Sequence, residues 1–135
     1  MANAECRMRN KNVMNNDLKD RTWKFALRII RMTEALPRDR VADILATQVL
    51  RSGTSVGANY RAACRAKSPR DFIAKIGIVE EECDETLYWL ELLVESDQIK
   101  LAKVQSLMQE ADELLRIVIA SAKTARRNSA SHVRR

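Results

Sequence analysis

The spacing of apolar positions along the chain predicts four helices. The first runs from Asp17 to Leu36, where apolar or small side chains recur every three or four residues, as on one helix face. Its stripe consists of Leu18, Thr22, Phe25, Ile29, Met32 and Leu36. Pro37 cannot continue a helix, so we expect the first helix to end there.

Three further stripes follow. Asp39 can cap a second helix that runs to about Lys67. The residues that share one face of this helix are Val41, Leu45, Gln48, Ser52, Val56, Asn59 and Ala63. Ser68-Pro69-Arg70-Asp71 begins a third helix, because serine caps well and proline suits the first helical position. That helix runs to about Glu95 on Phe72, Ile76, Val79, Cys83, Leu87, Leu90 and Val94. After a turn at Ser96-Asp97-Gln98, the fourth stripe is Val104, Leu107, Ala111, Leu114, Val118 and Ala122.

Long helices joined by short turns indicate an all-α, up-down-up-down antiparallel four-helix bundle. We expect the bundle domain to span residues 17–127. Residues 1–16 lack an apolar period, and residues 128–135 are basic and rich in serine and arginine, so both are predicted to be disordered tails. Translation could begin at Met1, Met8 or Met14.

Two helices carry a second apolar face. On the third helix it lies opposite the stripe centred on Ile76, and on the first helix it either forms a separate surface or widens the core face. A monomeric bundle needs one apolar stripe per helix, so we expect a homo-oligomer. The candidate interface residues are Trp23, Leu27, Ile30, Ile78, Glu85, Trp89 and Leu92.

The segment Arg51–Ala62 places polar residues on or beside the core face of the second helix. A catalytic serine would need a nearby base, but the sequence has no Ser-x-x-Lys or Gly-x-Ser-x-Gly motif, and its only histidine is His132 in the tail. A phosphate-binding loop would need a Gly-Lys-Ser/Thr sequence, which is also absent. We therefore favour a structural role, in which Gly53 and Gly57 permit close helix contact. The predicted polar core, bonded across the bundle, is Ser52, Ser55 and Asn59.

An acidic block, residues 80–85, raises an enzyme hypothesis. With Glu110 and Glu113 it loosely resembles the carboxylate pattern of all-α nucleotide pyrophosphohydrolases, which hold Mg²⁺. Glu85 lies opposite the core stripe of its helix, so these carboxylates are not expected to converge in one chain. We expect no enzyme activity, no metal site and no cofactor.

The net charge of +6 is strongly segregated along the sequence. Residues 1–75 carry sixteen bases and seven acids, residues 76–97 carry eight acids and no base, and residues 98–135 carry eight bases and three acids. Basic strips suit non-specific contacts with phosphates, although a solvated face is an equal alternative for any single strip. We expect no sequence-specific readout of bases by these strips. The candidate residues are Arg21, Lys24, Arg28, Arg31, Arg61, Arg65, Lys123, Arg126 and Arg127.

No apolar run reaches the length of a membrane span, and no signal peptide opens the chain. Cys6, Cys64 and Cys83 have no paired spacing, so we expect reduced thiols and a cytoplasmic protein without membrane partners.

The run Gln48–Asn59, then Asp71-Phe72, then Glu85-Thr-Leu-Tyr-Trp-Leu90, resembles the four helix bundle protein family. That family includes proteins encoded in intervening sequences of bacterial 23S ribosomal RNA genes, and it is similar to the accessory variability determinant of diversity-generating retroelements. The resemblance implies a bundle that assembles as a barrel-shaped homopentamer. It also implies a possible nucleic-acid partner and a protein partner such as a reverse transcriptase.

The sequence therefore predicts a non-enzymatic, homo-oligomeric bundle, a pentamer by resemblance, that binds RNA or DNA backbone. The first alternative is a protein-binding scaffold that binds no nucleic acid. The second is a Mg²⁺-dependent nucleotide pyrophosphohydrolase.

Overall fold

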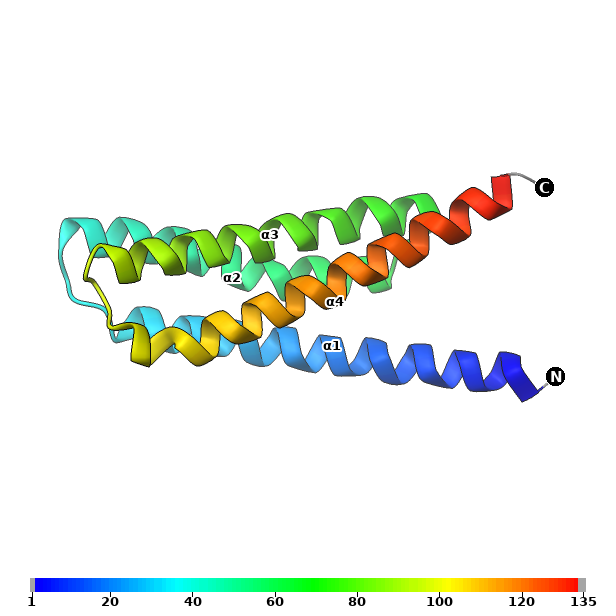
Figure 1. Cartoon of the computed structure of the whole chain (residues 1–135), viewed down its shortest axis with the longest axis horizontal. Helices are drawn as coiled ribbons and strands as arrows, with labels where there is room; N and C mark the ends of the chain where they lie inside the picture. The colour runs from blue at the N-terminus through cyan, green and yellow to red at the C-terminus, as the bar shows by residue number, and fades with distance from the viewer. Residues whose placement is uncertain (1, 134–135) are drawn as a thin grey trace.

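The chain forms an all-α four-helix bundle (Figure 1). The computed structural model describes the backbone of residues 2–133 and the side chains of residues 17–131. Its helices are α1 (Ala2–Glu34), α2 (Arg40–Cys64), α3 (Pro69–Glu95) and α4 (Leu101–Val133). Consecutive helices run antiparallel, so the architecture has the predicted up-down-up-down order. No helix among the described residues has an apolar stretch long enough to cross a bilayer.

Helices α2 and α3 begin where the capping residues in the sequence predicted. The Asp39 carboxylate accepts a hydrogen bond from the Ala42 amide at 2.8 Å and so caps α2. The Ser68 hydroxyl accepts one from the Asp71 amide at 3.0 Å, and Pro69 opens α3. Asp97 adopts the left-handed backbone conformation (φ 61°), which aspartate tolerates better than most residues. The two capping bonds satisfy amides at the first turns of α2 and α3 and fix where these helices begin.

The buried core agrees with the predicted stripes of α1 and α4 at every position. The α2 stripe is displaced. Val41, which we predicted to face the core, is half exposed, whereas Val49 and Tyr60 are buried. The reason is that α2 packs extensively against both α1 and α3, which requires a broader face than a single stripe, whereas α1 and α4 pack only lightly against each other.

Both outer helices extend beyond the predicted boundaries. We predicted a tail over residues 1–16, but α1 begins at Ala2. We predicted a tail over residues 128–135, but α4 continues to Val133, and residues 134–135 lie outside the described residues. Lengthening an existing helix is much easier than nucleating one, and no glycine or proline interrupts either extension. The absence of an apolar period therefore did not end these helices.

Two glycines bring α2 close to α1, as their spacing predicted. A Cβ atom added at Gly53 would lie 2.8 Å from Cγ1 of Ile29, and one added at Gly57 would lie 3.3 Å from the backbone oxygen of Thr22. Side chains at these positions would push the two helices apart. The pair thus fixes both the separation and the register of α1 and α2.

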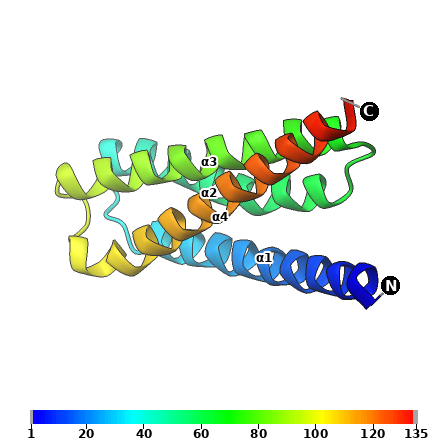
Figure 2. The same ribbon diagram turned by 45° about the vertical axis from the view of Figure 1, so that its right-hand side comes forward.

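The pair α1 and α4 is held differently. The two helices lie side by side near the α3–α4 connection and diverge toward the chain ends (Figures 1 and 2). They pack against each other less extensively than the other neighbouring pairs do. Polar bonds from α1 to α4 supplement the apolar packing: Arg21 to Glu110, and Arg28 to the Ser106 hydroxyl.

Candidate nucleic-acid interface

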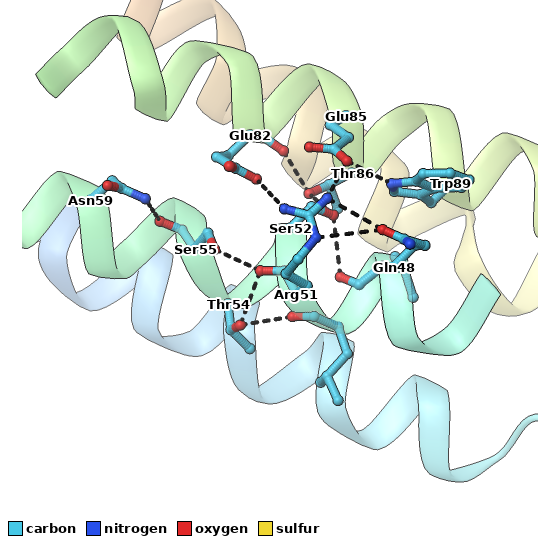
Figure 3. A network of polar contacts seen from close by, with 12 residues as sticks. Gln48, Arg51, Ser52, Thr54, Ser55, Asn59, Glu82, Glu85, Thr86 and Trp89 are labelled. Carbon is cyan, nitrogen blue, oxygen red and sulfur yellow. Dashed lines mark hydrogen bonds and ion pairs between the residues drawn. The ribbon is translucent and has the colours of Figure 1, made fainter. Parts of the chain in front are cut away.

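The polar segment of α2 contributes one bond across the core. A hydrogen bond of 3.0 Å joins the hydroxyls of Ser52 and Thr86, which are both fully buried (Figure 3). Thr86 also bonds to the Glu82 carbonyl at 2.7 Å. Among the described residues, no buried side-chain nitrogen or oxygen atom lacks a partner. Ser52 and Thr86 therefore link α2 to α3 without leaving an unsatisfied group in the core.

The other two predicted core residues behave differently, and for them the prediction of cross-bundle bonds was wrong. The Ser55 hydroxyl donates to the Arg51 carbonyl at 2.7 Å, and the Asn59 amide donates to the Ser55 carbonyl at 2.9 Å. Both acceptors lie four residues earlier in α2. A short polar side chain in a helix reaches that carbonyl easily, so these side chains bond locally.

Arg51 lies at the centre of the polar network between α2 and α3 (Figure 3). Its guanidinium ion-pairs with Glu85 and lies 3.5 Å from a carboxylate oxygen of Glu82. The Trp89 indole also donates to Glu85, at 3.1 Å. Burial and the nearby Glu85 charge raise the pKa of Glu82 above its usual value. The network neutralises part of the acidic block from within the chain.

The carboxylates of the hydrolase hypothesis lie on different seams. Glu85 binds Arg51 between α2 and α3. Glu110 and Glu113 instead contact Arg21 of α1, at 2.8 and 3.4 Å. Within the described residues, no three histidine, cysteine, aspartate or glutamate side chains come together as metal ligands would. As expected from the sequence, Glu85 therefore lies apart from Glu110 and Glu113 within the described chain.

The predicted basic residues fall into two groups. Three are engaged within the chain: Arg21 with Glu110, Arg28 with Ser106, and Lys24 with Asp20 at 2.8 Å. The others are exposed, and none of them has an ion-pair partner among the described residues. They are Arg31 on α1, Arg61 and Arg65 at the end of α2, and Lys123, Arg126 and Arg127 on α4. The regular strip predicted on α1 is therefore largely occupied by internal contacts.

A groove of about 770 Å³ lies between α1 and α2. On the α1 side it is lined by Lys19, Asp20, Thr22, Trp23, Ala26, Leu27 and Ile30. On the α2 side it is lined by Thr54, Gly57, Ala58, Arg61 and Arg65. Arg61 and Arg65 also border a smaller hollow of about 350 Å³ that reaches Lys75 of α3. We refer to the larger hollow as the α1–α2 groove.

Three of the predicted oligomer-interface residues line the groove. Trp23, Leu27 and Ile30 line it beside the cations of α2, so they do not form a purely apolar face. On α3, Trp89 is only partly exposed and packs against the core, contrary to its predicted outward position. Its large ring reaches back to the core although its Cα lies on the far side of the stripe. Glu85, another predicted interface residue, ion-pairs with Arg51 of the same chain.

Two apolar side chains remain well exposed on the outer face of α3. Ile78 is 42% exposed, and Tyr88, which was not among the predicted interface residues, is 54% exposed. The Tyr88 ring lies edge-on against Trp89 with ring centroids 4.9 Å apart. Leu92 is half-buried. The outer face of α3 therefore keeps a smaller apolar surface than its sequence suggested.

The sequence pattern of the family described as 23S rRNA-intervening sequence protein matches residues 14–120. The chain belongs to this family. The match contains the whole Gln48–Asn59 run and the Glu85–Leu90 run that carried the resemblance.

A solved relative supports both family and fold. It is a crystal structure of a protein of unknown function from the S23 ribosomal protein family of Bacteroides thetaiotaomicron. The two chains share 38% identity with a TM-score of 0.76, over 81% of this chain and 97% of that chain. No curated protein sequence matches the chain.

Sequence reasoning missed Lys19 as a member of the groove. Lys19 and Arg61 are far apart in the chain, and they meet only because α1 and α2 pack in a particular register. The signal was available in Gly53 and Gly57, which mark where α2 approaches α1. Gly57 lies against Thr22 and Gly53 lies against Ile29. Aligning the two helices at these contacts places Lys19 near the end of α2.

Proposed function

We propose that this family member is a non-enzymatic, homo-oligomeric bundle of the cytoplasm that binds RNA or DNA backbone through the α1–α2 groove. One observation carries the proposal: Lys19, Arg61 and Arg65 come from two helices to line a single hollow. The one carboxylate among the described lining residues, Asp20, is paired with Lys24 at 2.8 Å. The cations of the groove are thus left to attract an anion.

The chemistry of these cations suits phosphates. Arginine offers several donors in a planar fork that matches phosphate oxygens, and lysine adds a mobile point charge. Such contacts fix a nucleic acid without reading its sequence. The excess of acidic residues on α3 repels the same ligand, so the uneven charge of the molecule favours approach at the groove.

Self-association adds to this proposal. Ile78 and Tyr88 leave an apolar surface on α3, and its burial between copies would remove that surface from water. Several copies would then present several grooves, and avidity would strengthen binding that is weak at each groove.

The descriptions of the family and of its solved relative refer to 23S rRNA and to a ribosomal protein family. These names support RNA as the first nucleic acid to test for this chain.

The test is a binding titration with two double variants. Replacing Arg61 and Arg65 by glutamine removes two phosphate contacts and should weaken binding to a labelled RNA at least about tenfold at low salt. The slope of log K against log salt should become shallower by roughly 1.4 to 1.8. Fluorescence anisotropy at several salt concentrations measures both quantities.

A matched control removes the same charge elsewhere. Arg38 and Arg40 are exposed at the opposite end of α2, about 30 Å from Arg61 at about 1.5 Å per helical residue. Their replacement by glutamine should change affinity much less than the groove variant. Equal losses in both variants would show that only net charge matters. The absence of a salt-dependent complex with RNA or DNA would reject the proposal and favour the protein-binding scaffold.

A further inference from the structure

The α1–α2 groove contains an exposed tryptophan beside its cations. The side chain of Trp23 is 63% exposed, the most of any large apolar residue in the described part of the chain. It lines the same hollow as Arg61 and Arg65. Leaving a large ring in water forgoes the free energy of its burial, so an exposed tryptophan beside a group of cations suggests that a ligand covers it.

The register of the two helices orders the groove from end to end. Gly57 lies against Thr22, and Gly53 lies against Ile29, so α2 runs antiparallel to α1 along the groove. Lys19 therefore lies toward Arg61, and Ile30 lies toward Thr54 at the other end. Trp23 lies between a cationic end and an apolar wall that includes Leu27.

We propose that the groove binds unpaired nucleotides, with a base stacked on Trp23 and phosphates held by Lys19, Arg61 and Arg65. This inference rests on the proposed function and specifies its ligand. Stacking on an aromatic ring tolerates any base, because every base has a π-face. A base within a duplex is already stacked and paired, so its flat face cannot reach Trp23. The groove therefore distinguishes single strands from duplexes by shape and not by sequence.

Charge favours this ligand over a second copy of the chain in the groove. Three cations face the groove, and its one described carboxylate is already paired. The apolar wall lies on one side only, whereas a helix seated in the groove would need apolar contacts along its length. A second copy in the groove would make Trp23 a determinant of particle mass, which the experiment measures.

The experiment compares a single-stranded 12-mer with a duplex of the same length, each as RNA and as DNA. Trp23→Ala should weaken single-strand binding about 5- to 150-fold, the range that corresponds to the loss of one stacked base. Duplex binding should change less than twofold. Trp23→Phe keeps a ring and should restore most of the single-strand affinity. Because Trp23 is largely exposed, the alanine variant should keep its thermal midpoint and helix content.

A second readout follows the indole directly. The chain has two tryptophans, so Trp89→Phe leaves Trp23 as the only one. Its fluorescence should be quenched by the single strand and not by the duplex. If Trp89→Phe lowers stability, the affinity comparison in the otherwise unchanged chain still decides the matter.

The outcomes separate this inference from the proposed function. Salt-dependent binding that Trp23→Ala leaves unchanged, or weakens equally for single strand and duplex, overturns the stacking site and leaves backbone binding intact. A fall in particle mass on Trp23→Ala shows that a second copy occupies the groove and overturns it as well. Failure of the unmodified chain to bind any of these nucleic acids rejects both proposals together.

Discussion

Replacing Gly53 by leucine is expected to destabilise the bundle by roughly 3 kcal/mol or more, because the new side chain has no space between α1 and α2. Even a Cβ atom would lie 2.8 Å from Cγ1 and 3.0 Å from Cγ2 of Ile29. Ile29 is fully buried, and its β-branched side chain has little rotational freedom, so it cannot move aside cheaply. Denaturant unfolding at a fixed protein concentration gives the free energy of unfolding.

Alanine provides a matched pair of variants with opposite expected signs. Gly77 lies in α3, and a Cβ atom added there has no neighbour within 4 Å. Gly77→Ala should stabilise the protein by about 0.5–1 kcal/mol, since alanine is the better helix former. Gly53→Ala receives the same benefit but should still be destabilising overall, by about 1–2 kcal/mol, because of the contact with Ile29. Stabilisation by both changes would contradict the close α1–α2 contact.

Ile78→Glu is expected to reduce the proposed oligomer to single chains. The substitution replaces an exposed apolar side chain on α3 with a carboxylate, one helical turn from the exposed Glu81. Burying a carboxylate without a partner between subunits costs several kcal/mol, which exceeds the margin of most small interfaces. Multi-angle light scattering measures the change as a fall in particle mass.

Ile44 supplies the control. It is also an exposed isoleucine, at 55%, but it lies on α2, outside the proposed interface. Ile44→Glu should leave the particle mass unchanged. A charge at Trp89, another predicted interface residue, would disturb the bundle itself, because Trp89 packs against the core and donates to Glu85. A mass insensitive to Ile78→Glu, or sensitive to Ile44→Glu, would mean that another surface joins the subunits.

The stripes of α1 and α4 could be predicted from the sequence because each of these helices packs extensively against only one neighbour, and the two pack lightly against each other. Every stripe residue from Leu18 to Leu36 is buried, as is every one from Val104 to Ala122. The α2 stripe was less accurate because that helix packs against two neighbours, with glycines toward α1 and Ser52 toward α3. Periodicity gives the direction of one face, but it does not give the width of a face shared by two partners.

The candidate site was harder to predict for a related reason. Angular position on one helix placed Trp23 correctly as an outward residue, and spacing within α2 placed Arg61 and Arg65 together. Their meeting depends on the relative register of two helices, which no single-helix pattern contains. Likewise, the pattern of the first helix alone does not show that Arg21 and Arg28 bond to α4.

Binding of nucleic acid in the α1–α2 groove can be tested directly by photo-crosslinking the unmodified chain to a single-stranded RNA that contains 4-thiouridine and locating the attached residues by mass spectrometry. Binding in the α1–α2 groove predicts attachment at Trp23 and in the α2 segment that ends with Arg65. Attachment confined to the exposed cations Lys123, Arg126 and Arg127 of α4 would contradict it.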